Sequence, residues 1–163
     1  MLPRGEVASV TRSSERGASK MWVFTNKGFF SVVQDRNDST KLLVRSRIKG
    51  DLERVFGEEI EAAGAWVTET PKADYRFRVF LPKEMVVAQI AREVDEIDYG
   101  NYKNSYAGNT DIPQPLRSVM KYHMTDAWSA MWAAQKEAKE LEEAYEENDG
   151  AHIFWGSSPT VSD

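Results

Sequence analysis

The sequence predicts an α+β fold: one antiparallel sheet of four or five strands, two helices on one face of it, and a long C-terminal helix. Three observations predict this class. Short runs of aromatic and β-branched residues between 21 and 81 are typical of strands. Two apolar stripes at helical spacing lie near 52–63 and 83–97, and a longer periodic stretch covers 115–147. Strand–strand–helix repeated twice, a ββαββα order, can close one sheet with both helices on one side.

The first strands are predicted at residues 21–25, 29–34 and 41–48. The first two are rich in aromatic and β-branched side chains, and turn-type residues at 26–28 separate them. In the third, successive side chains point to opposite faces, so Val44 lies on one face and Arg45 and Arg47 lie on the other. One face of the sheet is therefore expected to be core and the other wet.

A helix is predicted over residues 52–63, with Asp51 as its N-cap and Gly64 as the left-handed residue after its end. Strands follow at 65–70 and 75–81. Alternation in the second of these places on one face Tyr75, Phe77, Val79 and Leu81, and on the other face Arg76, Arg78 and Phe80. Pro82 suits the first turn of the next helix, which is expected over 83–97.

Residues 98–115 are rich in Gly, Asn, Pro and Tyr, and they are predicted to form a long loop. The last helix is expected over 115–147. Its apolar positions are Leu116, Met120, His123, Ala127, Met131 and Ala134, broadened by Met124, Trp128 and Trp132. Its second half is highly charged and is expected to project into solvent.

Length and composition indicate one domain with tails. The chain has 163 residues, 41% of them hydrophobic, which is enough for one core and too short to favour two domains. We expect a disordered leader at 1–20, a single α+β domain at 21–147 and a flexible tail at 148–163. The chain contains no Cys, no secretory signal and no apolar run long enough to span a membrane. The expected location is the cytoplasm, with no membrane association.

The net charge of −5 argues against a general nucleic-acid binder, but the charges are unevenly distributed. Bases outnumber acids between residues 21 and 54, whereas acids dominate between 137 and 149. The chain is therefore polarised, with basic strands and an acidic late helix.

Five segments spread along the chain carry a resemblance to a known family. They are MWVFTNKGFFSVVQ, KLLVRSRIKGDLE, ADYRFRVFL, IDYGNYK and YHMTDAW. Together, over about residues 21–132, they resemble a family of short uncharacterised proteins from actinobacteria, other bacteria and their phages. The resemblance implies a cytoplasmic bacterial or phage accessory protein. It implies no activity, cofactor or catalytic residue.

A basic sheet face is the first candidate site. It comprises Arg45, Arg47, Arg76, Arg78 and Phe80. Arginines beside exposed rings can combine attraction to phosphate with base stacking, so these residues are a candidate nucleic-acid surface. The alternatives are a solvated face, or arginines paired with the acidic last helix.

An aromatic surface is the second candidate site, and it favours a protein partner. It comprises Tyr99, Tyr102, Tyr106, Trp128 and Trp132. Such side chains are typical anchors at interface centres, although the two tryptophans could instead cap the sheet. We therefore expect a non-catalytic, protein-binding accessory protein, with nucleic-acid binding as the alternative. The acidic half of the last helix could also mimic nucleic acid toward a basic partner.

A metal-dependent nuclease is the third hypothesis. Acids end the second helix, and His123 and Asp126 lie three residues apart on the last helix; the acids are Glu93, Asp95, Glu96 and Asp98. Carboxylates with an imidazole can hold a divalent ion that activates water. The spacing matches no metal motif, and nucleotide-binding loops and the hydrolase elbow are absent from the sequence. No metal ligand, cofactor or catalytic residue is predicted.

Overall fold

The computed structural model describes residues 20–149, and their side chains from 21 to 145. Contacts within the chain group the described residues into two compact units, a sheet unit at 20–98 and a helical unit at 99–149. From the sequence we expected one domain over 21–147. Of the predicted leader and tail, residues 1–19 and 150–163 lie outside the described residues.

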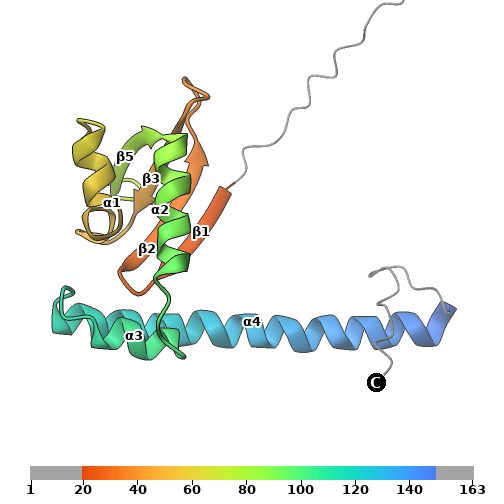
Figure 1. Cartoon of the computed structure of the whole chain (residues 1–163). Helices are drawn as coiled ribbons and strands as arrows, with labels where there is room; N and C mark the ends of the chain where they lie inside the picture. The colour runs from red at the N-terminus through yellow and green to blue at the C-terminus, as the bar shows by residue number, and fades with distance from the viewer. Residues whose placement is uncertain (1–19, 150–163) are drawn as a thin grey trace, which may run out of the picture. The chain divides into compact units, whose positions relative to one another are not determined.

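Five antiparallel strands form the sheet of the sheet unit, which confirms the α+β prediction (Figure 1). The first three are β1 (Lys20–Thr25), β2 (Gly28–Gln34) and β3 (Lys41–Ser46). Asp35 and Asp38 shape the turn before β3, because their carboxylates accept the N–H groups of Asn37 and Thr40, each at 2.9 Å. The bounds of these three strands confirm the prediction within one or two residues.

The last two strands are β4 (Thr68–Glu69) and β5 (Phe77–Pro82). The predicted strand over 65–70 is shortened to two residues, because only Thr68 and Glu69 pair with β5. The sheet order is β1-β2-β3-β5-β4. The ββαββα prediction was wrong in one respect, since three strands precede the first helix.

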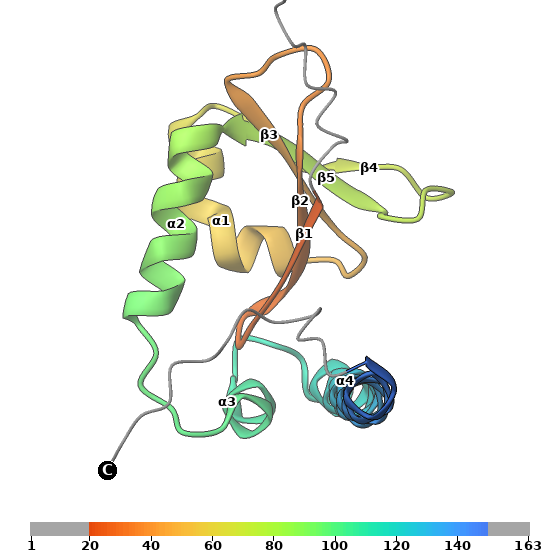
Figure 2. The same cartoon turned by 90° about the vertical axis from the view of Figure 1, so that its right-hand side faces the viewer.

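Two helices, α1 (Asp51–Ala62) and α2 (Lys83–Asp95), pack on one face of this sheet (Figure 2). The N-cap of α1 is Gly50, at φ 89°, and not Asp51 as predicted. Asp51 instead turns its side chain inward to the β1–β2 turn. Gly64, at φ 58°, follows the end of α1 as predicted. Pro82 is the N-cap of α2 and the last residue of β5, not a residue of the first turn.

The main core lies between this sheet face and the two helices. Its ten buried residues are Phe30, Val32, Val44, Leu52, Val55, Phe56, Phe77, Val79, Leu81 and Val86. The strand residues among them alternate along β2, β3 and β5, as expected where one face is buried. The opposite face of the sheet is consequently left without a covering helix from this unit.

The helical unit contains α3 (Tyr102–Gly108) and α4 (Gln114–Asp149). The predicted loop at 98–115 therefore holds a helix, capped by Asn101, whose side chain accepts the N–H of Asn104 at 3.1 Å. A small core of Tyr106, Ile112 and Met124 joins α3 to the first turns of α4. From residue 125 to residue 145 every side chain of α4 is exposed.

Candidate functional site

The sheet face opposite α1 and α2, here called the open sheet face, gathers Arg45, Arg47 and Arg78 and several aromatic rings. Strand register aligns its side chains in rows across the sheet. One row runs Trp22, Ser31, Arg45, Arg78, and a second runs Val33, Leu43, Phe80. Because these residues alternate with the core positions of their strands, they point away from the two helices.

Exposed rings lie on this face at its edges. Trp22 is 64% exposed, Phe24 45% and Phe80 50%. The ring of Phe24 stacks on that of Phe29 with 4.4 Å between centroids, and Trp22 meets Phe29 edge-on at 6.2 Å. These contacts fix the orientation of the rings while leaving large apolar surfaces open to a partner.

Tyr75 organises the arginines at the centre of the face. The guanidinium carbons of Arg45 and Arg47 lie 4.4 and 4.7 Å from the centroid of its ring. Arg78 donates through Nε to the carbonyl oxygen of Tyr75 at 3.0 Å. The sequence placed Tyr75 on the core face with Phe77. That prediction was wrong because Tyr75 precedes β5, where strand alternation does not apply.

Each of the four predicted arginines is engaged within the sheet unit. Arg45 donates to the hydroxyl of Ser31 at 3.0 Å, and Arg47 to the carboxylate of Asp74 at 2.9 Å. Arg76 lies before β5 and pairs through Nε with Glu69 at 2.7 Å. None of these partners belongs to the acidic last helix. The open sheet face therefore presents exposed aromatic rings, together with guanidinium groups that already interact with neighbouring side chains or carbonyl groups.

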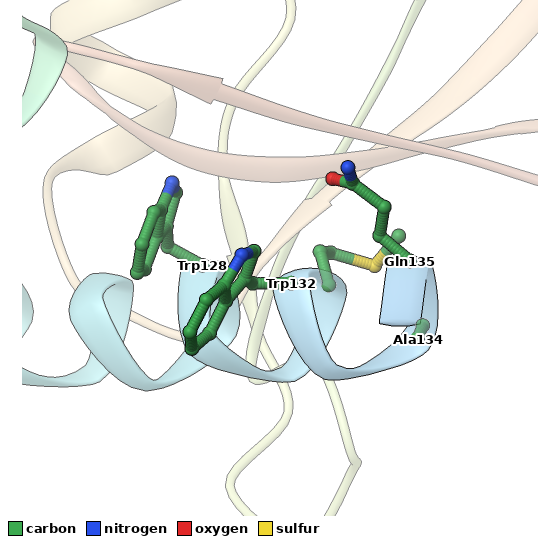
Figure 3. A pocket seen from close by; sticks show the side chains of 5 residues that line it. Trp128, Trp132, Ala134 and Gln135 are labelled. Carbon is green, nitrogen blue, oxygen red and sulfur yellow. The ribbon is translucent and has the colours of Figure 1, made fainter. Parts of the chain in front are cut away.

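The predicted aromatic surface is divided between a core and a solvent-exposed stack. Tyr106 is fully buried, so its ring belongs to the small core and not to a partner surface. Tyr99 and Tyr102 are half-buried, and Tyr102 packs against that core. Trp128 and Trp132 are exposed and stack with centroids 6.0 Å apart and 14° between planes (Figure 3).

Lysines extend this stack at both ends. Lys136 Nζ lies 3.9 Å from the Trp132 ring centroid, and Lys103 Nζ lies 5.2 Å from that of Trp128. Such contacts hold the indoles in a fixed orientation on the surface of α4. A shallow hollow of about 480 Å³ lies beside them, lined by Trp128, Met131, Trp132, Ala134 and Gln135.

The residues of the metal hypothesis do not assemble. Glu93 and Glu96 both bind Lys27 Nζ, at 2.7 and 3.0 Å. His123 is exposed, contrary to its predicted place on the apolar stripe, and its only acidic neighbour among the described residues is Asp126, at 3.7 Å. Within the described part of the chain, no three His, Asp or Glu side chains converge as metal ligands. Asp95 and Asp98 are also exposed.

A polar cluster between α1 and α2 was not found from the sequence. Arg92 binds Glu58 and Glu59, at 3.1 and 2.5 Å, and Gln89 donates to Glu93 at 3.0 Å. Burial lowers the pKa of Lys27, but its hydrogen bonds to Glu93 and Glu96 outweigh this and raise it. The cluster borders a hollow of about 190 Å³. Since its charges pair with one another, it serves to join the helices.

Asp51 is a further buried acidic residue, for which the sequence pattern predicted only the role of an N-cap. It accepts the N–H of Phe29 at 3.1 Å and pairs with Arg54. Burial raises its pKa to about 6, against the opposing effect of the Phe29 hydrogen bond and Arg54. Gly28 leaves room for it, because a Cβ there would lie 2.8 Å from the carboxyl carbon of Asp51. Asp51 therefore ties the β1–β2 turn to α1.

Among the described residues, no helix is both long enough and apolar enough to cross a membrane. Comparison of the chain with family models, with curated proteins and with solved structures gave no match.

Proposed function

We propose that this protein is a small non-catalytic accessory protein of a bacterium or phage, acting in the cytoplasm by binding a protein partner through the open sheet face. The observation that carries the proposal is the combination on that face of exposed Trp22, Phe24 and Phe80 with arginines that already have partners. Trp, Tyr and Arg are the residues enriched at the energetic centres of protein interfaces.

The chemistry of the face also defines the partner. Its rings offer apolar area at low cost in side-chain entropy, because stacking on Phe29 already restrains Trp22 and Phe24. Around them, Arg47 and Arg76 keep exposed guanidinium groups paired with single carboxylates. The fitting partner is a protein surface with an apolar centre and acidic residues at its border.

Affinity capture with the full chain tests this proposal. Tagged wild-type protein is incubated with a bacterial lysate, with and without nuclease treatment, and bound proteins are identified. We expect a captured protein whose recovery survives nuclease treatment and falls at least about tenfold with Trp22→Ala and Phe80→Ala combined, since hot-spot truncations cost about 2 kcal/mol or more.

Val94→Ala is the matched control, because Val94 is 63% exposed and lies on α2, the helix that packs on the opposite face of the sheet. This variant should capture the partner as the wild type does. Equal recovery by all three proteins would remove the open sheet face as the binding surface. Recovery that disappears with nuclease would favour nucleic acid instead.

Nucleic acid is the second candidate partner, because rings and guanidinium groups share the open sheet face. The exposed pairs Arg47–Asp74 and Arg76–Glu69 are worth little in water, so phosphates could replace their carboxylates. A labelled single-stranded oligonucleotide should then shift at about 50 mM salt, and less at about 200 mM. The quadruple alanine variant at Arg45, Arg47, Arg76 and Arg78 should abolish the shift. Absence of a shift with wild type at low salt would exclude this candidate.

A further inference from the structure

The described part of α4 carries an apolar seam with heptad spacing. Apolar residues recur at alternating intervals of three and four, as in a left-handed coiled coil; they are Met120, Met124, Ala127, Met131, Ala134, Ala138 and Leu141. Residues of α3 and of the loop after it cover the start of this seam, since Met124 packs with Tyr106 and Ile112. Beyond Met124 the seam continues in solvent, with Met131 70% and Leu141 59% exposed.

We propose that the exposed seam of α4 binds the same seam of a second copy of this chain in an antiparallel coiled coil. Heptad spacing identifies the occupant as another helix, because knobs-into-holes packing requires a partner with the same repeat. This inference is independent of the proposed function, which concerns the sheet unit.

The distribution of charge along α4 favours a second copy as the partner, in the antiparallel orientation. Residues 114–136 contain three bases and one acid, whereas 137–145 contain one base and four acids. An antiparallel copy places each acidic half beside a basic half, whereas a parallel copy places like charges together. Charged residues beside a seam set partner choice and orientation in this way.

The residues that flank the seam also distinguish a parallel pair from an antiparallel pair. In a parallel pair, Glu137 would face Glu142 of the second copy, twice in each dimer. In the antiparallel register that pairs Met131 with Ala134, Lys121 faces Glu142 of the second copy instead, also twice. Like charges across a coiled coil repel and opposite charges attract, so this register is the one that the sequence of α4 favours.

The hollow beside the tryptophans lies at the centre of this register. Met131 and Ala134 line it, and they form the central layer in which a large side chain meets a small one (Figure 3). Trp128 and Gln135 border it and face each other across the pair. The methionine of the second copy would thus fill the space above Ala134.

Sedimentation equilibrium of the full chain tests self-association from about 1 µM to about 200 µM, where mass action shows a dimer as a rising average mass. We expect a dimer. Ala134→Glu should weaken it at least about tenfold, because a charge in the seam must be desolvated. The matched control, Ala133→Glu, makes the same substitution one residue earlier, outside the seam, and should leave the dimer intact. Both sites are exposed in the single chain, so circular dichroism should show unchanged helix content.

Glu142→Lys tests the orientation. In the antiparallel pair it places two lysines together and weakens association, and adding Lys121→Glu restores it. In a parallel pair it would relieve the contact with Glu137 and strengthen association. A chain that stays monomeric throughout, or a dimer indifferent to Ala134→Glu, would overturn the proposal. A dimer strengthened by Glu142→Lys would overturn the antiparallel arrangement.

Cysteine cross-linking gives a direct geometric readout, because the chain contains no native Cys. In the proposed register Ala127 faces Ala138 of the second copy. A mixture of the single variants Ala127→Cys and Ala138→Cys should form a disulfide-linked dimer under mild oxidation, and neither variant should do so alone. Cross-linking by each variant alone would contradict the antiparallel register, since disulfides require Cα atoms within about 7 Å.

Discussion

The sheet unit and the helical unit use their apolar residues in opposite ways. In the sheet unit, ten buried apolar side chains form one core between a sheet and two helices. In the helical unit, three buried residues join α3 to the start of α4, and the described remainder of that helix exposes its apolar side chains. An amphipathic helix gains most of its stability from packing of its apolar face. The comparison teaches that the sheet unit buries its apolar side chains within itself, whereas α4 leaves most of its own exposed.

Polar side chains also differ between the units: the sheet unit buries several of them, whereas the charged side chains of α4 pair at the surface. The sheet unit buries Asp51, Glu59 and Gln89 and supplies each with a hydrogen-bonding partner. On α4, described charged side chains pair only at the surface, as Lys139 does with Glu143 at 3.5 Å. Buried charges specify how the elements of the sheet unit fit together, while surface charges on α4 remain available to a second helix.

The largest expected effect is in the main core. Phe30→Ala removes a fully buried ring that meets Phe56 at 5.0 Å, and should lower the free energy of unfolding by about 3–5 kcal/mol. Val119→Ala, at a 53% exposed position of α4, should change it by less than about 0.5 kcal/mol. Urea unfolding followed by tryptophan fluorescence measures both. Similar losses of unfolding free energy for the two variants would contradict the contrast between the buried core of the sheet unit and the exposed surface of α4.

The next effect concerns the buried carboxyl group of Asp51. Because its folded pKa is raised to about 6, the folded state binds the proton more tightly than the unfolded state. This contribution to stability is complete at low pH and is lost as the pH rises through about 6. The unfolding free energy of Asp51→Asn relative to wild type should therefore rise by about 2 kcal/mol between pH 4 and pH 7.

Urea titrations at several pH values measure this difference, with Asp95→Asn, at an exposed position of α2, as the control for a carboxylate outside the core. A pH-independent difference for Asp51→Asn would show that its pairing with Arg54 compensates fully for burial. The buried charge of the sheet unit would then behave like the surface charges of α4.

The smallest effect tests the small core by itself. Ile112→Val removes one buried methylene and should cost about 1 kcal/mol, which corresponds to about fivefold faster hydrogen exchange in α3. Exchange in β2 and β3 should stay unchanged. Faster exchange in those strands would show that the two units unfold together.

Much of the fold could be predicted from residues near one another in the sequence. The positions of β1, β2, β3, α1 and α2 followed from aromatic and apolar spacing, and so did most of α4. Arg45, Arg78 and Phe80 alternate with the core residues of β3 and β5, as the sequence pattern predicts, whereas Arg47 and Arg76 lie outside the strands, where alternation does not apply. The missed α3 is seven residues long and has an Asn cap, a signal that the surrounding Gly, Asn and Pro concealed.

The candidate site was predictable only in part. Tyr106 was expected on a partner surface and is buried in the small core. His123 was expected on the apolar stripe of α4 and is exposed. The apolar stripe predicted for α4 ends at Ala134 and includes His123, whereas the heptad seam runs through Met124 and continues to Ala138 and Leu141, in the half of the helix predicted only to be charged. Only the exposure of those side chains showed that the seam lacks cover.

The sequence by itself determined most of the strands and helices, although not α3 or the shortness of β4, because alternation and helical periodicity depend on neighbours along the chain. The tertiary structure alone decided that β5 lies between β3 and β4, that Tyr75 turns toward Arg45 and Arg47, and that each arginine finds a partner inside the sheet unit. Those features depend on contacts between residues distant in sequence, and many different pairings are compatible with the same local pattern.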